Sequence, residues 1–179
     1  MNEIRIAVSG SHGIGKTTLV NKIATARQLP MINEVVRDVA KMLNYATTAQ
    51  ILTENHNSKL QFQSIVFNEQ IGRESNYAGF VSDRSVFDPI AYGLYYGLSR
   101  YVMKNWQEQA IKHSSSYDVI IYCPIPEESI EDDGFRLMDK EGEQAVDNYI
   151  SALLSSAKCK VWWLSNDREK WSNEILQNL

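Results

Sequence analysis

Apolar residues in this chain alternate between the spacing of a buried strand and that of an amphipathic helix. Runs with strand character lie at 3–9, 29–33, 79–82, 119–123 and 161–164. Helical spacing predicts helices at about 16–27, 35–43, 55–77, 86–97, 99–115 and 145–154, with a last helix at the end of the chain. Strands separated by helices predict a three-layer α/β fold with a mainly parallel sheet of about five strands.

The size and composition of the chain favour a single compact domain over residues 1–179. Its hydrophobic content is 44%, and no apolar run approaches the roughly 20 residues of a membrane helix. Strand-like sequence begins almost at once, so no signal peptide is expected. Cys123 and Cys159 lie in or beside apolar runs without metal spacing, which favours core thiols in the reducing cytoplasm. The net charge of −4 disfavours a general nucleic-acid coat but permits a local basic groove.

The clearest chemical motif is GSHGIGKT at 10–17, between the first strand and the first helix. The pattern G-x-x-x-x-G-K-[ST] lets consecutive backbone N–H groups cradle phosphate oxygens, because glycine tolerates conformations that a Cβ forbids. Lys16 suits the β- and γ-phosphates, the Thr17 hydroxyl suits Mg²⁺, and the helix N-terminus adds its positive dipole end. We therefore expect ATP and Mg²⁺ to bind at a site formed by Gly10, Ser11, His12, Gly13, Ile14, Gly15, Lys16, Thr17 and Thr18.

Ligands of such folds gather at the carboxyl ends of the strands, which directs attention to the residues after the second and third strands. Glu34 follows the second strand and could accept a proton from an attacking hydroxyl, although the helix dipole alone also favours a glutamate there. Arg37, one turn later, either holds substrate or phosphate or lies in solvent. Asp83 directly follows an apolar strand and could hold Mg²⁺, directly or through water. Its neighbour Arg84 could stabilise charge on the transferred phosphoryl group, the alternative being a salt-bridged turn.

Two further regions carry weaker signals. The polar segment 127–143 contains a glycine and Arg136. It suits a lid that closes over the phosphates and brings the arginine inward, whereas a solvated loop is the plainer interpretation. On the long helix, Gln63 shares a face with Asn55 and Gln70. An amide that both donates and accepts suits the edge of a nucleobase, although a single helical glutamine is more often a surface residue.

Two stretches beyond the phosphate loop resemble the P-loop kinases of nucleosides and nucleotides: KLQFQSIVFNEQIGRE at 59–74 and VSDRSVFDPIAYGLYYG at 81–97. The first resembles the base-contacting helix of deoxynucleoside kinases, with its Phe-Gln pair. The second resembles their Glu/Asp-Arg-Ser motif, with a further Asp four residues after the Arg. NEVVRDVA at 33–40 is similar to the nicotinamide riboside kinase type, and the chain also resembles thymidylate kinase.

The resemblance implies an ATP-dependent phosphotransferase that acts on a small nucleoside or nucleotide. It implies that Lys16, Thr17 and Asp83 contact the donor phosphates and the metal, and that Glu34 is the general base. It also implies that Arg84 and Arg136 stabilise the charge of the transferred group. The acceptor would contact Arg37, Gln63 and Asp88. The chain departs from the pattern of deoxynucleoside kinases at two points. Gln70 stands where they often have an arginine, and Glu34 is followed by valine where proline is common.

Three other classes of P-loop protein compete with this interpretation. A regulatory GTPase needs an Asn-Lys-x-Asp motif, and the chain offers only SND at 165–167. A non-kinase ATPase of the motor or remodelling type normally brings an extra domain, for which 179 residues leave little room. Phage-type kinases that phosphorylate 5-hydroxymethyluracil within DNA resemble nucleotide kinases closely, and Arg100, Lys104, Lys112 and His113 could form the basic groove they need. The sequence leaves open the identity of the acceptor, its base, and whether the protein is a homodimer.

Overall fold

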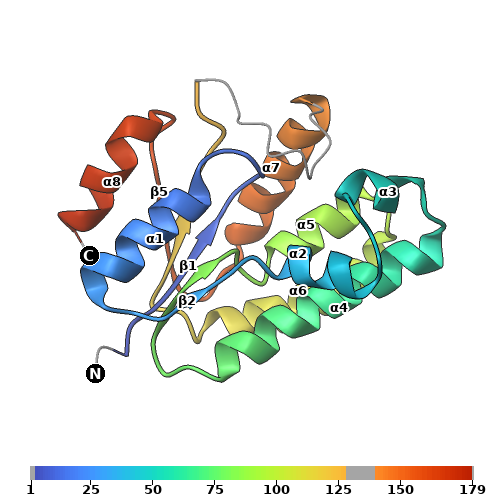
Figure 1. The fold of residues 1–179 in the computed structure, drawn as a ribbon, viewed down its shortest axis with the longest axis horizontal. Helices are drawn as coiled ribbons and strands as arrows, with labels where there is room; N and C mark the ends of the chain where they lie inside the picture. Colours follow the sequence, from blue (N-terminus) through green and yellow to red (C-terminus); the bar gives the residue numbers. More distant parts are fainter. Residues whose placement is uncertain (1–2, 128–139, 179) are drawn as a thin grey trace.

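The computed structural model describes residues 3–127 and 140–178, which form a parallel sheet covered by helices on both faces (Figure 1). The strands are β1 (Arg5–Ser9), β2 (Met31–Ile32), β3 (Phe80–Asp83), β4 (Val119–Tyr122) and β5 (Lys160–Trp163). They lie in the order β2-β3-β1-β4-β5, and every neighbouring pair is parallel. The predicted three-layer α/β fold is confirmed.

Strand order decides which chain segments meet at the functional edge of the sheet. β1 lies at the centre between β3 and β4, with Val8 opposite Asp83 and Ser9 opposite Tyr122. Because all strands run the same way, their carboxyl ends share one edge. The phosphate loop after β1 therefore lies between the residues that follow β3 and those that follow β4.

Helices cover the two faces unequally. α1 and α8 pack on one face, whereas α4, α5, α6 and α7 lie on the other (Figure 1). The helices are α1 (Lys16–Arg27), α2 (Val35–Met42), α3 (Thr48–Thr53), α4 (His56–Ser75), α5 (Asp88–Tyr95), α6 (Arg100–Ser114), α7 (Lys140–Leu154) and α8 (Arg168–Leu176). None of these helices combines the length and the apolar character that a membrane span requires.

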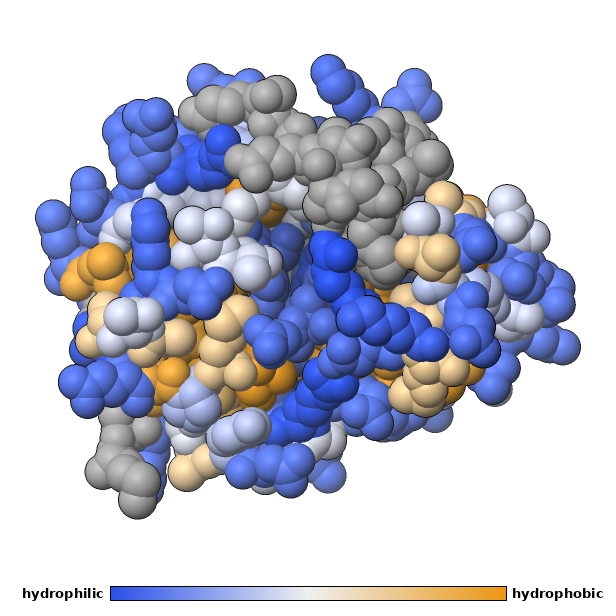
Figure 2. Space-filling view, in the orientation of Figure 1, coloured by the Kyte–Doolittle hydropathy of each residue, from blue (hydrophilic) through white to orange (hydrophobic). Residues whose placement is uncertain are grey.

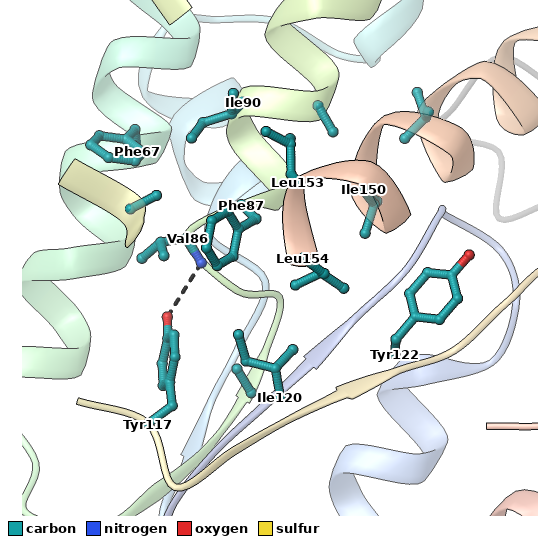
Figure 3. Close-up of a cluster of buried hydrophobic side chains, with 14 of the residues drawn as sticks. Phe67, Val86, Phe87, Ile90, Tyr117, Ile120, Tyr122, Ile150, Leu153 and Leu154 are labelled. Carbon is teal, nitrogen blue, oxygen red and sulfur yellow. Dashed lines mark hydrogen bonds between the residues drawn. The ribbon is translucent and has the colours of Figure 1, made fainter. Parts of the chain in front are cut away.

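The core follows the alternation of apolar residues in the strands. In β1, Ile6 and Val8 are buried against α1 and α8, whereas Ala7 belongs to the cluster on the opposite face. Figure 3 shows that second cluster, in which side chains of α4, α5 and α7 gather over β4. Its labelled members include Phe67, Phe87, Ile90, Ile120, Ile150, Leu153 and Leu154. This packing fixes α5, and with it the residues that follow β3.

One helix boundary agrees with the sequence, in which Asn55 is a candidate cap of the long helix, and one differs from it. The long helix begins at His56, where the Asn55 side chain accepts from the Ser58 backbone N–H at 3.0 Å, and the separate short helix α3 precedes it. α7 begins at Lys140, inside the segment predicted as a lid. The remainder of that segment, 128–139 with Arg136, lies outside the described residues.

Candidate active site

The phosphate loop leaves β1 at Gly10 and enters α1 at Lys16. Gly10 has φ +149°, and a Cβ there would overlap the carbonyl oxygen of Cys123, so only glycine fits. Gly15 has φ +95° and sits directly before the first turn of α1. The Lys16 side chain is 4% exposed and donates to the carbonyl oxygen of Ser11, across the loop's own concavity. These residues form the cradle that the motif predicts.

Thr17 and Asp83 form the link between the phosphate loop and β3. The Thr17 hydroxyl donates to Asp83 Oδ2 at 2.5 Å, and Asp83 is only 3% exposed. Two oxygen ligands beside a phosphate cradle fit Mg²⁺, which usually keeps water and substrate phosphates as its other ligands. Within residues 3–127 and 140–178, no group of three or more His, Cys, Asp or Glu side chains forms a further candidate metal site.

Arg84 is the hub of the charged residues at this edge of the sheet. Its guanidinium donates to the Gly10 carbonyl oxygen at 2.6 Å, to Glu34 Oε1 at 2.9 Å and to Asp88 Oδ1 at 3.1 Å. It also lies 5.2 Å from the centre of the Tyr92 ring. Burial alone would lower the pKa of Arg84, but Tyr92 and the surrounding carboxylates raise it well above its ordinary value. The guanidinium therefore remains charged although it is buried.

The backbone of Arg84 is as unusual as its side chain. Its φ is +113°, in the left-handed region that side chains rarely adopt, and its N–H donates to the Val8 carbonyl oxygen at 3.0 Å. Such conformations persist where the surrounding structure enforces them, and they gather at functional sites. Here the hydrogen bond to β1 holds the Arg84 backbone. Its side chain is held by Gly10, Glu34, Asp88 and the Tyr92 ring.

Asp88 lies at the start of α5 with both carboxylate oxygens occupied. Oδ2 accepts from the Ser9 hydroxyl at 2.6 Å and from the Ser85 hydroxyl at 2.7 Å, while Oδ1 contacts Arg84. The residue is 1% exposed. The resemblance implies an acceptor contact for Asp88, and the structure places it at the pocket wall, where it ties β1 to α5.

Glu34 is positioned by the first turn of α2 and by two arginines. Its Oε1 receives the Arg84 guanidinium, and its Oε2 lies 3.4 Å from Arg37 Nε. The Glu34 side chain is 13% exposed, whereas that of Arg37 is 43% exposed. The carboxylate therefore faces the site while Arg37 reaches it from solvent.

A pocket beside Glu34 and Arg84 lies at the carboxyl edge of the sheet, and its free volume is about 30 Å³. Gln63 of α4 is 1% exposed there, and its Oε1 has no hydrogen-bond partner among residues 3–127 and 140–178. Figure 2, drawn in the orientation of Figure 1, shows hydrophilic side chains gathered across the middle of the molecular surface, between the α1 side and the α2–α4 side. The pocket is lined by Glu34, Val35, Val36, Thr48, Gln63, Val66, Gln70, Arg84, Asp88, Pro89, Tyr92 and Tyr96.

Gln70 also lines the pocket, but its amide is committed to the protein. Its Nε2 donates to Glu74 Oε1 at 2.7 Å, to Ser82 Oγ at 2.8 Å and to the Arg84 carbonyl oxygen at 3.3 Å. Gln70, which stands where deoxynucleoside kinases often have an arginine, thus stabilises the strained backbone at Arg84 by a hydrogen bond to its carbonyl oxygen.

The four basic residues of α6 differ in their exposure to solvent. Arg100, Lys104 and Lys112 are exposed, whereas His113 turns inward, with Nε2 only 2.6 Å from Oε2 of the fully buried Glu74. The groove predicted for DNA therefore lacks one of its four members.

Two carboxylates of α7 near the phosphate loop carried no signal in the sequence. Glu143 Oε1 lies 3.2 Å from His12 Nε2. Asp147 accepts from the Tyr122 hydroxyl at 2.8 Å and is 7% exposed. Burial raises the pKa of Asp147, while the Tyr122 hydrogen bond and the charge of Lys16 oppose that rise. Both residues stand in an ordinary amphipathic pattern, so only the fold reveals their position.

Comparison with known proteins agrees with this geometry. The family model described as an AAA domain matches residues 5–170. Similar solved structures include a NadR protein in complex with NR, at 18% identity and a TM-score of 0.69 over 97% of this chain and 50% of that one. Deoxyadenosine kinase from M. mycoides, with dCMP and dCDP, has 11% identity and a TM-score of 0.67 over 97% of both chains. Shikimate kinase from Aquifex aeolicus has 16% identity and a TM-score of 0.58, over 97% of this chain and 95% of that one.

These matches establish the fold. The chain spans about half the length of the NadR protein and nearly all of the other two kinases. No curated protein matches it. The resemblance to the P-loop kinases of nucleosides and nucleotides is thereby confirmed.

Proposed function

We propose that this chain, which belongs to the AAA domain family, transfers the γ-phosphoryl group of ATP to a small nucleoside or nucleotide in the cytoplasm. The observation that carries the proposal is the contact of Thr17 with Asp83 beside a pocket that contains Glu34 and Arg84. This arrangement supports a donor site and an acceptor site at one edge of the sheet. The similar NadR protein binds NR, and the similar deoxyadenosine kinase binds dCMP and dCDP, which supports a nucleoside-like acceptor.

The donor half of the proposed reaction uses the phosphate loop. Backbone N–H groups of the loop and the α1 N-terminus would hold the phosphates. The Lys16 ammonium would leave the Ser11 carbonyl for the β- and γ-phosphates. Thr17 and Asp83 would hold Mg²⁺, which neutralises the charge that develops on the phosphoryl oxygens.

The acceptor half uses the pocket between α2, α4 and α5. Gln63 Oε1 is a buried acceptor without a partner, so an N–H group of the incoming molecule would satisfy it. Val35, Val66 and Tyr96 would supply apolar walls. Arg84 and Asp88 lie in the same lining and would face the polar groups of the acceptor.

Catalysis in phosphoryl transfer rests mainly on positioning and charge stabilisation. Glu34 would orient the acceptor hydroxyl and accept its proton, because its carboxylate lies at the pocket beside Arg84. Arg84 would stabilise the negative charge of the transferred group. The bond to the donor's bridging oxygen breaks as the bond to the acceptor oxygen forms, and the proton passes to Glu34.

Glu34→Gln tests the role of the carboxylate. We expect turnover to fall by about 10²- to 10⁴-fold, with a much smaller rise in the Michaelis constant, because glutamine keeps the shape but cannot take the proton. Glu69→Gln is the matched control, since Glu69 also pairs with an arginine but lies 45% exposed on α4. Equal kinetics of Glu34→Gln and Glu69→Gln would contradict the assigned role.

A transfer screen tests the function and identifies the acceptor. Labelled ATP is offered with nucleosides, nucleoside monophosphates, or a DNA duplex that contains 5-hydroxymethyluracil, and hydrolysis without acceptor is measured in parallel. We expect transfer to a small acceptor, a shallow salt response, and a loss of activity in Gln63→Ala but not in the exposed control Gln109→Ala. If DNA is the acceptor, its affinity should fall steeply with salt. Each phosphate contact would lower the affinity by about tenfold when the salt concentration rises tenfold.

Two results of the screen would replace the proposal. Phosphorylation of DNA alone, sensitive to alanine at Arg100, Lys104 and Lys112, would establish the DNA kinase alternative. Hydrolysis of ATP with none of these acceptors phosphorylated would favour a non-kinase ATPase of the AAA domain family.

A further inference from the structure

His12 joins the phosphate loop to two helices, α5 and α7. Its Nδ1 lies 3.1 Å from the Tyr92 hydroxyl of α5, and its Nε2 lies 3.2 Å from Glu143 Oε1 of α7. The imidazole is buried, at 8% exposure, and Glu143 is 2% exposed. The Tyr92 hydroxyl lies within hydrogen-bond distance of the ring, and the Glu143 carboxylate lies within ion-pair distance of it.

Tyr92 belongs to the acceptor pocket as well as to this contact. It lines the pocket, and its ring lies beneath the Arg84 guanidinium at 5.2 Å. Arg84 in turn donates to the Gly10 carbonyl oxygen. Arg84 therefore holds the Gly10 end of this loop segment and Tyr92 holds its His12 end, and the two pocket side chains contact each other.

We propose that His12 is a positioning residue that couples donor binding in the phosphate loop to the acceptor pocket through Tyr92, and to α7 through Glu143. The inference rests on the proposed function in taking residues 10–17 as the donor site. An acceptor in the pocket would contact Tyr92, and any movement of Tyr92 acts on the loop through His12. Occupation of the acceptor site thus changes the affinity for the donor, although no acceptor atom touches the donor phosphates.

Binding of the ATP analogue AMP-PNP with Mg²⁺, measured by calorimetry without any acceptor, tests the coupling. Tyr92→Phe removes the hydroxyl and keeps the ring beneath Arg84. We expect its Kd for AMP-PNP to rise by about fivefold or more, within the range of couplings between sites, and Glu143→Gln to weaken binding in the same direction. Tyr95→Phe is the matched control, because it also removes one tyrosine hydroxyl of α5, and that hydroxyl packs against Gly142 of α7.

A double variant separates coupling from general loosening. Tyr92→Phe should add nothing in a His12→Gln background, because the bond through which it acts is already lost. The chain has three histidines, so ¹⁵N signals of the imidazoles are readily assigned, and Tyr92→Phe should shift those of His12 while leaving the other two unchanged.

Equal or tighter AMP-PNP binding by Tyr92→Phe, or additive effects in the double variant, would overturn the inference and leave the proposed function standing. Failure of the wild-type protein to bind AMP-PNP would remove both together. The two failures are therefore distinguishable in one set of titrations.

Discussion

Replacement of Lys16 by alanine should abolish tight ATP binding and phosphoryl transfer and leave the fold intact. The ammonium is the one charge of the phosphate loop aimed into its own concavity, where it now donates to the Ser11 carbonyl oxygen. Loss of one such preorganised donor costs about 10²- to 10³-fold in rate in other enzymes. The Kd for ATP and the transfer rate measure the effect, and the melting temperature measures the fold.

Lys41→Ala is the control for this experiment. Lys41 is an exposed lysine in the last turn of α2, so its loss changes the net charge equally without touching the loop. We expect the control to keep wild-type affinity. A Lys16→Ala protein with unimpaired transfer would refute the assignment of residues 10–18 as the donor site.

Asp83→Asn should weaken the response to Mg²⁺. Asparagine can still accept from the Thr17 hydroxyl, so the 2.5 Å contact and the local fold survive while the charge is lost. Loss of a carboxylate beside a metal typically weakens metal affinity by about 10- to 100-fold. The measurement is the transfer rate as a function of Mg²⁺ concentration, in which the midpoint should move upward.

Asp38→Asn supplies the comparison, because Asp38 is a half-exposed carboxylate of α2 that pairs with Arg73. Its Mg²⁺ dependence should match that of the wild type. Glu34→Gln should also keep the wild-type midpoint of the Mg²⁺ dependence, because this substitution lowers turnover and leaves metal binding unchanged. Identical, mild defects in Asp83→Asn and Glu34→Gln would mean that metal binding and proton acceptance are assigned to the wrong residues.

Most of the fold could be predicted because its signals are local. The alternation around Ile6 and Val8 marks β1, the glycine loop marks its end, and helical spacing marks α1 at the bounds observed. The short helix α3 was missed because six residues give no clear period. Its only sequence signal is the capping box of Thr47 and Gln50.

The candidate site was less predictable because its contacts join distant parts of the chain. Thr17 and Asp83 were both expected near a metal, yet the bond between them follows from the register of β1 with β3. His12 and Tyr92 are 80 positions apart, and nothing in either local pattern marks them as partners. Gln70 was read as a departure from a kinase motif, and only the fold shows its amide beneath the Arg84 backbone.

A strained backbone and a stabilising charge cluster meet at one position, Arg84, so heat resistance and activity depend on the same side chain. A side chain at φ +113° costs about 1–3 kcal/mol, and glycine would relieve that strain. Glycine would also remove the guanidinium that holds Gly10, Glu34 and Asp88 together. Removing one partner of a buried charge cluster costs about 3–5 kcal/mol, which exceeds the strain that glycine would relieve. Libraries screened for heat resistance should therefore retain arginine at position 84 although its backbone is strained, and the charge centre of the site would survive selection for thermostability alone.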